Sequence, residues 1–230
     1  MVAIASTALV AMGLFAGAIT PAQAATKSTV ILHSSADITS LNSGIEGQGT
    51  TYNAVVGSLT GMGFTYYNSD ADLVMNTKFG TMKIVKQQPK DFQIQYTVTK
   101  GQTWSDGTPI DAVDLLLTHV VASGKYSVDA GLGDPKADGA PAFNSTSYGG
   151  TYDDNVVGLP KLSSDKMSLT VKFAKPLPDW ELLAPGPGAV HALQLMADGK
   201  KGLQSASVNA AAKAKFLKVF TSKNTDALKA

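Results

Sequence analysis

The sequence predicts a mixed α/β fold with an ordinary hydrophobic core. Apolar and polar residues alternate over residues 92–98, which is the period of a strand with one buried face. Over residues 113–121 apolar residues recur every three or four positions, as on one side of a helix. The chain has 230 residues, of which 44% are hydrophobic and 16% charged, a composition typical of a globular protein.

The first half of the chain is expected to form strands with few helices. Residues 29–33 are predicted to form a first strand, because Val30, Ile31 and Leu32 are a continuous apolar run, typical of a strand covered on both faces. Met82 and Ile84 continue the alternation on the other side of the turn at 88–91, so residues 82–98 are predicted to form a hairpin. The other expected elements here are a polar loop at 34–48, a helix at 52–59 and a strand at 62–67.

A turn and a helix follow the hairpin. The turn contains Asp106-Gly107, a pair that tolerates positive φ, and Pro109 stiffens its exit. Asp111 is the expected N-cap, with Asp114 three residues later. The apolar stripe ends near Gly124, the expected C′ residue. The stripe consists of Val113, Leu116, Leu117, Val120 and Val121.

The second half begins with a long irregular loop over residues 123–166, which are poor in large apolar side chains. Leu169, Val171 and Phe173 then alternate as a strand, which Pro176 ends. Short helices are expected at 179–183 and 190–196, and a longer one at 207–220. Its apolar positions are Val208, Ala212, Phe216, Val219 and Phe220, with Lys213, Lys215 and Lys218 on other faces.

Composition argues against several functions. The chain has no Arg and a net charge of +1, which disfavours binding of nucleic acids. The sequence contains only two Glu residues, Glu46 and Glu181, so candidates for a general acid or base are mostly Asp. No sequence motif of a catalytic nucleophile or of a metal site occurs. His33, His119 and His191 lack metal-ligand spacing, and His119 is expected at the surface or at the boundary of the core. We therefore predict a protein that is not an enzyme and needs no cofactor.

Residues 1–24 are predicted to be a signal peptide, because an uncharged apolar stretch ends in Ala22-Gln23-Ala24. The alternative, a membrane anchor, is disfavoured because the apolar run is shorter than the roughly 20 residues that a span needs. The sequence contains no Cys, so it offers neither disulfides nor an N-terminal site for lipid attachment. We therefore expect an exported protein, periplasmic or extracellular at the cell surface, that is not lipidated through Cys.

The hairpin, turn and helix together carry a resemblance. Tyr96 to Gly101, followed by Trp104-Ser105-Asp106-Gly107-Thr108-Pro109 and the helix start at Ile110 to Asp114, resembles the signature of family 5 extracellular solute-binding proteins. These are the dipeptide and oligopeptide receptors of ABC importers. In this sequence Val113 replaces the first acid usual at that helix start. Residues 63–67, 169–176, 179–181 and 189–191 also resemble family segments, in the same order along the chain.

The resemblance implies a class II periplasmic-binding-protein fold, in which two α/β lobes and a small extra domain close around a ligand. Residues 25–230 would be the N-terminal part of that fold, the first lobe plus the small extra domain, without the second large lobe. The implied partners are a peptide or other small solute and the membrane permease subunits of the importer. The protein would act as a monomer, capturing its ligand by domain closure.

The candidate ligand contacts come from two places. The loop after the first expected strand offers Ser35, Asp37, Thr39 and Asn42, because open α/β sheets bind solutes beyond the carboxyl ends of their strands. An ordinary solvated loop is the alternative. Trp180 could stack on a ligand, with core packing as its alternative. Residues 104–109, from Trp104 to Pro109, are interpreted as a structural turn with the aromatic side chain packed beneath it.

Two other functions stay open at this point. One is a truncated or non-transport surface protein that keeps only the first part of the fold. The other is a secreted hydrolase using an Asp pair such as Asp153 and Asp154, although adjacent acids in a Gly-rich stretch are usually a solvated turn.

Overall fold

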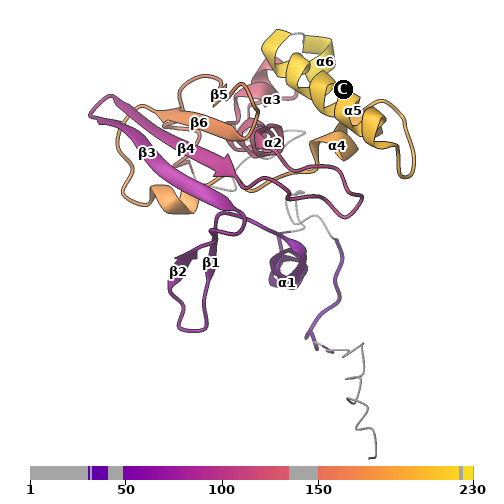
Figure 1. Cartoon of the computed structure of the whole chain (residues 1–230), viewed down its shortest axis with the longest axis horizontal. Helices are drawn as coiled ribbons and strands as arrows, with labels where there is room; N and C mark the ends of the chain where they lie inside the picture. Colours follow the sequence, from indigo (N-terminus) through magenta and orange to yellow (C-terminus); the bar gives the residue numbers. More distant parts are fainter. Residues whose placement is uncertain (1–30, 32, 41–48, 135–149, 223–224, 230) are drawn as a thin grey trace, which may run out of the picture. The chain divides into compact units, whose positions relative to one another are not determined.

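The structure is a computed structural model that describes residues 31, 33–40, 49–134, 150–222 and 225–229 (Figure 1). The predicted signal peptide lies outside these residues. Ile31 and His33, the described residues of the expected first strand, do not lie in a strand, and Ile31 is 73% exposed. The chain divides into two compact units, residues 1–36 and 37–230. The elements below belong to the second unit.

A four-stranded sheet forms the centre of this unit, in the order β3-β4-β6-β5 (Figure 1). The hairpin of β3 (Gly80–Gln88) and β4 (Asp91–Val98) was predicted correctly, and so was β6 (Ser168–Phe173). The edge strand β5 covers Lys161–Leu162. Neighbouring strands of this sheet all pair antiparallel. The loop at 34–42 was proposed as a ligand site because open α/β sheets bind solutes beyond the carboxyl ends of their parallel strands. That argument does not apply to this antiparallel sheet.

The core lies on one face of β4 and β6. Side chains on this face alternate with half-buried ones and are themselves buried, as the period-2 pattern predicted: Phe92, Ile94, Tyr96, Val98, Leu169, Val171 and Phe173. Each large apolar side chain so buried contributes about 1.5–3 kcal/mol. Helix α2 (Ala112–Ala122) contacts both strands and covers this face.

The ends of α2 are those that the sequence predicted. The Oδ1 of Asp111 accepts a hydrogen bond from the Val113 amide at 2.9 Å, and the Oδ2 of Asp114 accepts one from the Asp111 amide at 3.0 Å. This reciprocal pair is a capping box. Gly124 adopts a φ of 65° just after the C-cap Ser123, a conformation that glycine takes without strain.

The prediction that His119 lies at the surface or at the boundary of the core was wrong, because α2 is buried on more than its apolar stripe. His119 is 1% exposed, and its Nδ1 lies 3.0 Å from the hydroxyl of Tyr152. The helix contacts β4 and β6 and also α3 (Lys125–Asp129) and α4 (Val190–Ala197). A helix enclosed in this way buries polar positions that a one-stripe pattern assigns to solvent.

The remaining elements agree largely with the sequence pattern. The predicted helices at 52–59, 179–183 and 207–220 are α1 (Thr51–Thr60), the 3₁₀ helix η2 (Trp180–Leu183) and α5 (Ala206–Ser222). The expected strand at 62–67 is shorter, because β1 (Thr65–Tyr67) pairs only over the length of β2 (Leu73–Met75). Within 123–166, α3 and β5 interrupt the predicted irregular loop. A short helix α6 covers Thr225–Lys229.

The face that helix α5 presents to the core overlaps the predicted one at Ala212, Phe216 and Phe220 but is wider. Asn209, Ala212, Lys213 and Phe216 are buried, whereas Val208 is exposed. The prediction that Lys213 lies away from the core was therefore wrong, and its carboxylate partners are described below. Within the described part of the chain, no helix combines the length and the apolar character needed to span a membrane.

Candidate functional site

The signature turn, Trp104–Pro109, is a closed loop between β4 and α2. The Trp104 amide donates to the Thr108 carbonyl at 2.8 Å, and the Gly107 amide donates back to the Trp104 carbonyl at 2.9 Å. The Thr108 amide donates to the Asp106 Oδ1 at 2.9 Å, and Gly107 has a φ of 83°. The sequence Asp-Gly-Thr thus fixes its own turn, because Asp supplies an acceptor and Gly tolerates the positive φ.

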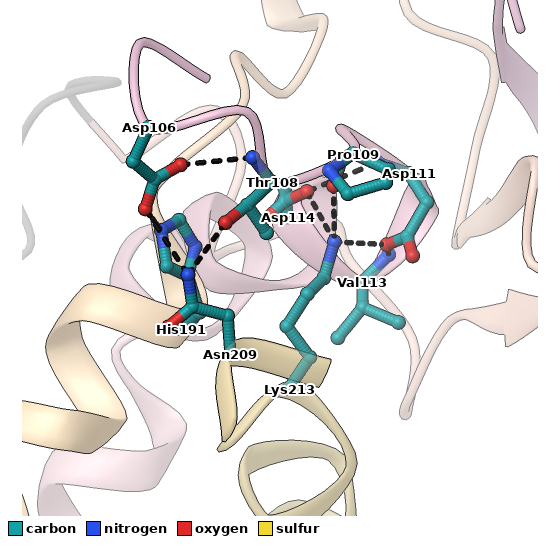
Figure 2. Close-up of polar contacts among 9 residues, drawn as sticks. All are labelled: Asp106, Thr108, Pro109, Asp111, Val113, Asp114, His191, Asn209 and Lys213. Atoms are coloured by element: carbon teal, nitrogen blue, oxygen red, sulfur yellow. Dashed lines mark hydrogen bonds and ion pairs between the residues drawn. The ribbon is translucent and has the colours of Figure 1, made fainter. Parts of the chain in front are cut away.

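The other carboxylate oxygen of Asp106 points toward α4 and α5 (Figure 2). His191 of α4 places its Nε2 2.9 Å from Asp106 Oδ2. Asn209 of α5 donates from Nδ2 to the same oxygen at 3.2 Å and to the Thr108 hydroxyl at 2.8 Å. The turn is therefore bound to two helices that lie about 85 and 103 residues later in the chain.

Lys213, one turn further along α5, joins the turn to the start of α2 (Figure 2). Its Nζ donates to the Pro109 carbonyl at 2.9 Å and to Asp114 Oδ2 at 2.7 Å, and lies 2.9 Å from Asp111 Oδ1. Lys213 is 7% exposed and Asp114 is fully buried. We call the following residues the buried cluster, although only Thr108, Asp114, His191, Asn209 and Lys213 among them are themselves buried: Asp106, Thr108, Pro109, Asp111, Asp114, His191, Asn209 and Lys213.

The pKa values of Asp106 and Asp114, two acids of the buried cluster, are shifted in opposite directions. The hydrogen bond from the Thr108 amide is the main cause that lowers the pKa of Asp106, and the contact with His191 also lowers it. Burial raises the pKa of Asp114, and the charge and hydrogen bond of Lys213 oppose this shift. Buried charges are tolerated when they are paired in this way.

The buried cluster has the geometry of a structural joint. A catalytic His–Asp pair must reach a substrate, but His191 is 3% exposed and its Nε2 is bonded to Asp106. The indole ring of Trp104 lies beside it, with ring centroids 6.3 Å apart. In the described residues, no group of three or more His, Asp or Glu side chains is arranged to hold a metal ion.

None of the predicted ligand residues belongs to the buried cluster. Ser35 belongs to the first compact unit, and Asp37 and Thr39 to the second; all of them are exposed. Asn42 lies outside the described residues. Asn53 of α1, which was not predicted as a site residue, is a buried polar residue that holds this loop. Asn53 Oδ1 accepts from the Thr39 and Ser40 amides at 3.0 and 3.2 Å, and its Nδ2 donates to the Thr39 hydroxyl at 3.1 Å.

Trp180 occupies a different environment from the loop residues. It lies in η2, where its half-buried side chain packs against the hydrophobic core. Its neighbours Asp179 and Glu181 are exposed. One part of the Trp180 side chain therefore packs in the core, as the alternative interpretation predicted. The other part is exposed and is the surface that a ligand would contact.

Comparison with known proteins gives partial matches. No family model matches the chain. Three curated relatives, uncharacterised lipoproteins of Mycobacterium bovis and of two strains of Mycobacterium tuberculosis, are each 31% identical over 64 residues. That segment is 28% of this chain and 11% of each relative.

Two solved structures are similar to this one, and both are of solute-binding proteins. A periplasmic EDTA-binding protein matches 61% of this chain and 24% of its own length, with a TM-score of 0.46 and 18% identity. An oligopeptide-binding protein of Thermus thermophilus, in complex with a pentapeptide, matches 74% of this chain and 28% of its own length, with a TM-score of 0.35 and 16% identity. The chain thus corresponds to about a quarter of each.

The relatives correct the prediction about lipid attachment. We expected an exported protein that is not lipidated through Cys, because the 230 residues contain no Cys. The matched mycobacterial proteins are lipoproteins by name, and lipoproteins carry their lipid on a cysteine. The prediction was therefore wrong in taking the cysteine content of these residues as evidence about lipid attachment.

Proposed function

We propose that this chain forms the first lobe of an extracytoplasmic solute-binding protein, which delivers peptides or similar small solutes to an ABC importer. The proposal is supported by the pattern over residues 96–114, which resembles the signature of that family. It is also supported by where this pattern lies in the fold, as the junction between β4, α2 and the helices α4 and α5.

The observation that carries the proposal is that the polar groups of the signature turn are engaged in holding helices together. Asp106, Thr108 and Pro109 bind His191, Asn209 and Lys213. A ligand that shifts the balance between open and closed forms needs lobes that keep their own shape. An enzyme instead needs accessible acids or bases, whereas Asp114, His191 and Lys213 are buried here, and Asp106 and Asp111 are engaged with His191 and Lys213.

The proposed ligand contacts remain Ser35, Asp37, Thr39, Asn42 and Trp180. Asn53 would act on Thr39 as a positioning residue, because it binds the backbone of Thr39 and Ser40 and so fixes the direction of the loop there. The proposed protein partners are the permease subunits of the importer, and the mechanism is capture by domain closure without covalent chemistry.

Thermal unfolding of the full 230-residue chain with a pool of dipeptides and oligopeptides tests the proposal. A ligand at 100 times its Kd adds about 2.7 kcal/mol to the free energy of unfolding and raises Tm. We expect this rise in the wild-type chain and a smaller one in Asp37→Ala. The matched control is Asp70→Ala, which removes another exposed aspartate from a turn outside the loop.

Cooperative unfolding at the same Tm with and without every peptide would refute the proposal and favour the alternative of a non-transport surface protein. An equal loss of the peptide effect in Asp37→Ala and Asp70→Ala would refute the assignment of the loop. Association of the purified chain with permease subunits encoded beside it would give a second, independent test of the transport role.

A further inference from the structure

A cavity of about 590 Å³ is lined by residues of α3 and of the C-terminal helices, and its lining includes no residue of the buried cluster or of the loop at 37–40. Helix α3 contacts α6, and both lie at the same end of α5 (Figure 1). The volume is within the range of roughly 300–1,000 Å³ that small-molecule sites occupy. The side chains that matter below are Lys125, Tyr126, Asp129, Leu159, Phe220 and Leu228.

The floor of the cavity is aromatic and is anchored in the core. The rings of Tyr126 and Phe220 meet edge to face, with centroids 5.1 Å apart at 90°. Phe220 packs on the buried Phe216 at 4.6 Å, and Tyr126 also packs on His119 at 6.2 Å. Edge-to-face pairs hold both rings in defined positions, so the floor is formed before any ligand binds.

Opposite charges stand at the rim of this floor. Lys125 and Asp129 are exposed, line the same cavity and lie one helical turn apart on α3. In the described part of the chain, neither side chain takes part in an ion pair or hydrogen bond. Asp129 is nevertheless close enough to Tyr126 to add to the effect of burial, which raises the pKa of the Tyr126 hydroxyl.

The order of Lys125 and Asp129 along α3 does not stabilise this helix. An acid placed four residues before a base stabilises a helix better than the reverse order, and the reverse order is found here. A base in the first turn and an acid in the last also oppose the helix dipole. Residues that lower the stability of their own helix, without a compensating contact, are typical of functional sites.

We propose that this cavity binds a small zwitterion with an apolar side chain, namely a free amino acid of the phenylalanine or leucine type. Lys125 would bind the carboxylate and Asp129 the ammonium group, since an amino acid carries both charges on one short backbone. The apolar side chain would pack on Tyr126, Phe220 and the flanking Leu159 and Leu228. This site is separate from the proposed capture of solutes for import and does not depend on it.

Isothermal titration of the full 230-residue chain with L-phenylalanine tests the ligand class. L-phenylalaninamide lacks the carboxylate and N-acetyl-L-phenylalanine lacks the ammonium group. We expect each analogue to bind about tenfold more weakly than L-phenylalanine, because each loses one charge-assisted contact. Absence of heat with about 10 mM L-phenylalanine would overturn the proposal, since millimolar Kd is the weakest useful affinity.

Variants then assign the two charges. Lys125→Met should bind L-phenylalanine about tenfold more weakly and no longer distinguish it from the amide. Asp129→Asn should no longer distinguish it from the N-acetyl compound. Both residues are exposed, so the unfolding midpoint should be unchanged, and Lys175→Met, exposed and outside the cavity, is the matched control.

Binding of L-phenylalanine that is unaffected by Lys125→Met and Asp129→Asn would overturn the proposal by placing the ligand elsewhere. That outcome would leave the proposed transport function intact. Conversely, charge-dependent binding in this cavity with no peptide effect on Tm would support this site and count against the transport function.

Discussion

Lys213 places its ammonium group 2.7 Å from the carboxylate of Asp114, a residue 99 positions earlier in the chain. Asp114 is fully buried and Lys213 nearly so. The same lysine also contacts Asp111 and the Pro109 carbonyl. It therefore holds the signature turn and the start of α2 in contact with α5. The stability of this half of the fold should therefore depend strongly on one side chain.

Replacing Lys213 by Met should lower the free energy of unfolding by roughly 3–5 kcal/mol, because it leaves the Asp114 carboxylate buried without its partner. Urea denaturation measures the change. The matched control is Lys215→Met on the same helix, which breaks an exposed ion pair with Asp198 and should have a much smaller effect. Equal losses in the two variants would show that Lys213 has no special structural role.

Asp111 has two roles: it is the N-cap of α2 and it forms an ion pair with Lys213. Two substitutions separate these roles. Asp111→Ala removes both and should cost about 1 kcal/mol or more, whereas Asp111→Asn keeps an oxygen for the Val113 amide and should cost less. Thermal unfolding of the two variants side by side measures the difference. If Asn proves as harmful as Ala, the charge facing Lys213 matters and the cap does not.

Burial of His119 should make the protein less stable in mild acid. Burial lowers the pKa of His119 from 6.5 to about 4, so the unfolded chain takes up a proton at a pH where the folded chain does not. Stability is therefore retained above pH 6.5 and falls as the pH drops toward 4. The full loss is about 3 kcal/mol at 1.36 kcal/mol per pKa unit.

The dependence of the free energy of unfolding on pH, measured by urea denaturation, tests this expectation. His119→Gln should flatten the curve over this range, even though it also alters the contact with Tyr152. The other histidines are unchanged in this variant and serve as its internal control. A variant whose slope equals that of the wild type would exclude His119 as the origin of the acid sensitivity.

Gly80 is expected to tolerate no side chain. A Cβ at this position would meet the carbonyl oxygen of Thr97 and lie 2.6 Å from the ring of Phe64. Gly80→Ala should therefore cost roughly 1–3 kcal/mol, because neither the paired strand nor the buried ring can move freely. Gly57→Ala in α1 meets nothing within 4 Å and should stabilise by about 1 kcal/mol. Chemical denaturation of both variants checks the opposite signs.

Local patterns predicted the elements of the fold well. The alternation from Phe92 to Val98 identified a strand with one buried face, and Asp111 with Asp114 identified the start of α2. These signals succeed because strand period and helix capping depend on residues only a few positions apart. The antiparallel pairing of β4 with β6 joins segments more than 70 residues apart, which no local pattern specifies.

The same limit explains what was missed at the candidate site. Lys213 was assigned to solvent, and His119 to the surface or the boundary of the core, from their polarity alone, because their buried partners lie far away in sequence. A weak signal was present for Lys213: Asn209, Lys213 and Phe216 lie on one face of α5 at helical spacing. Asn53 gave no comparable signal, since an Asn near a helix start is usually interpreted as a solvated or capping residue.

The joint closed by Lys213 also sets an order of events during biosynthesis. Translation adds about 5–20 residues per second, so Asp114 leaves the peptidyl transferase centre roughly 5–20 s before its lysine has been made. During that interval the Asp114 carboxylate lacks its lysine partner, so its burial between α2 and α5 would cost several kcal/mol. We therefore expect the start of α2 to reach its final packing only after α5 has been made.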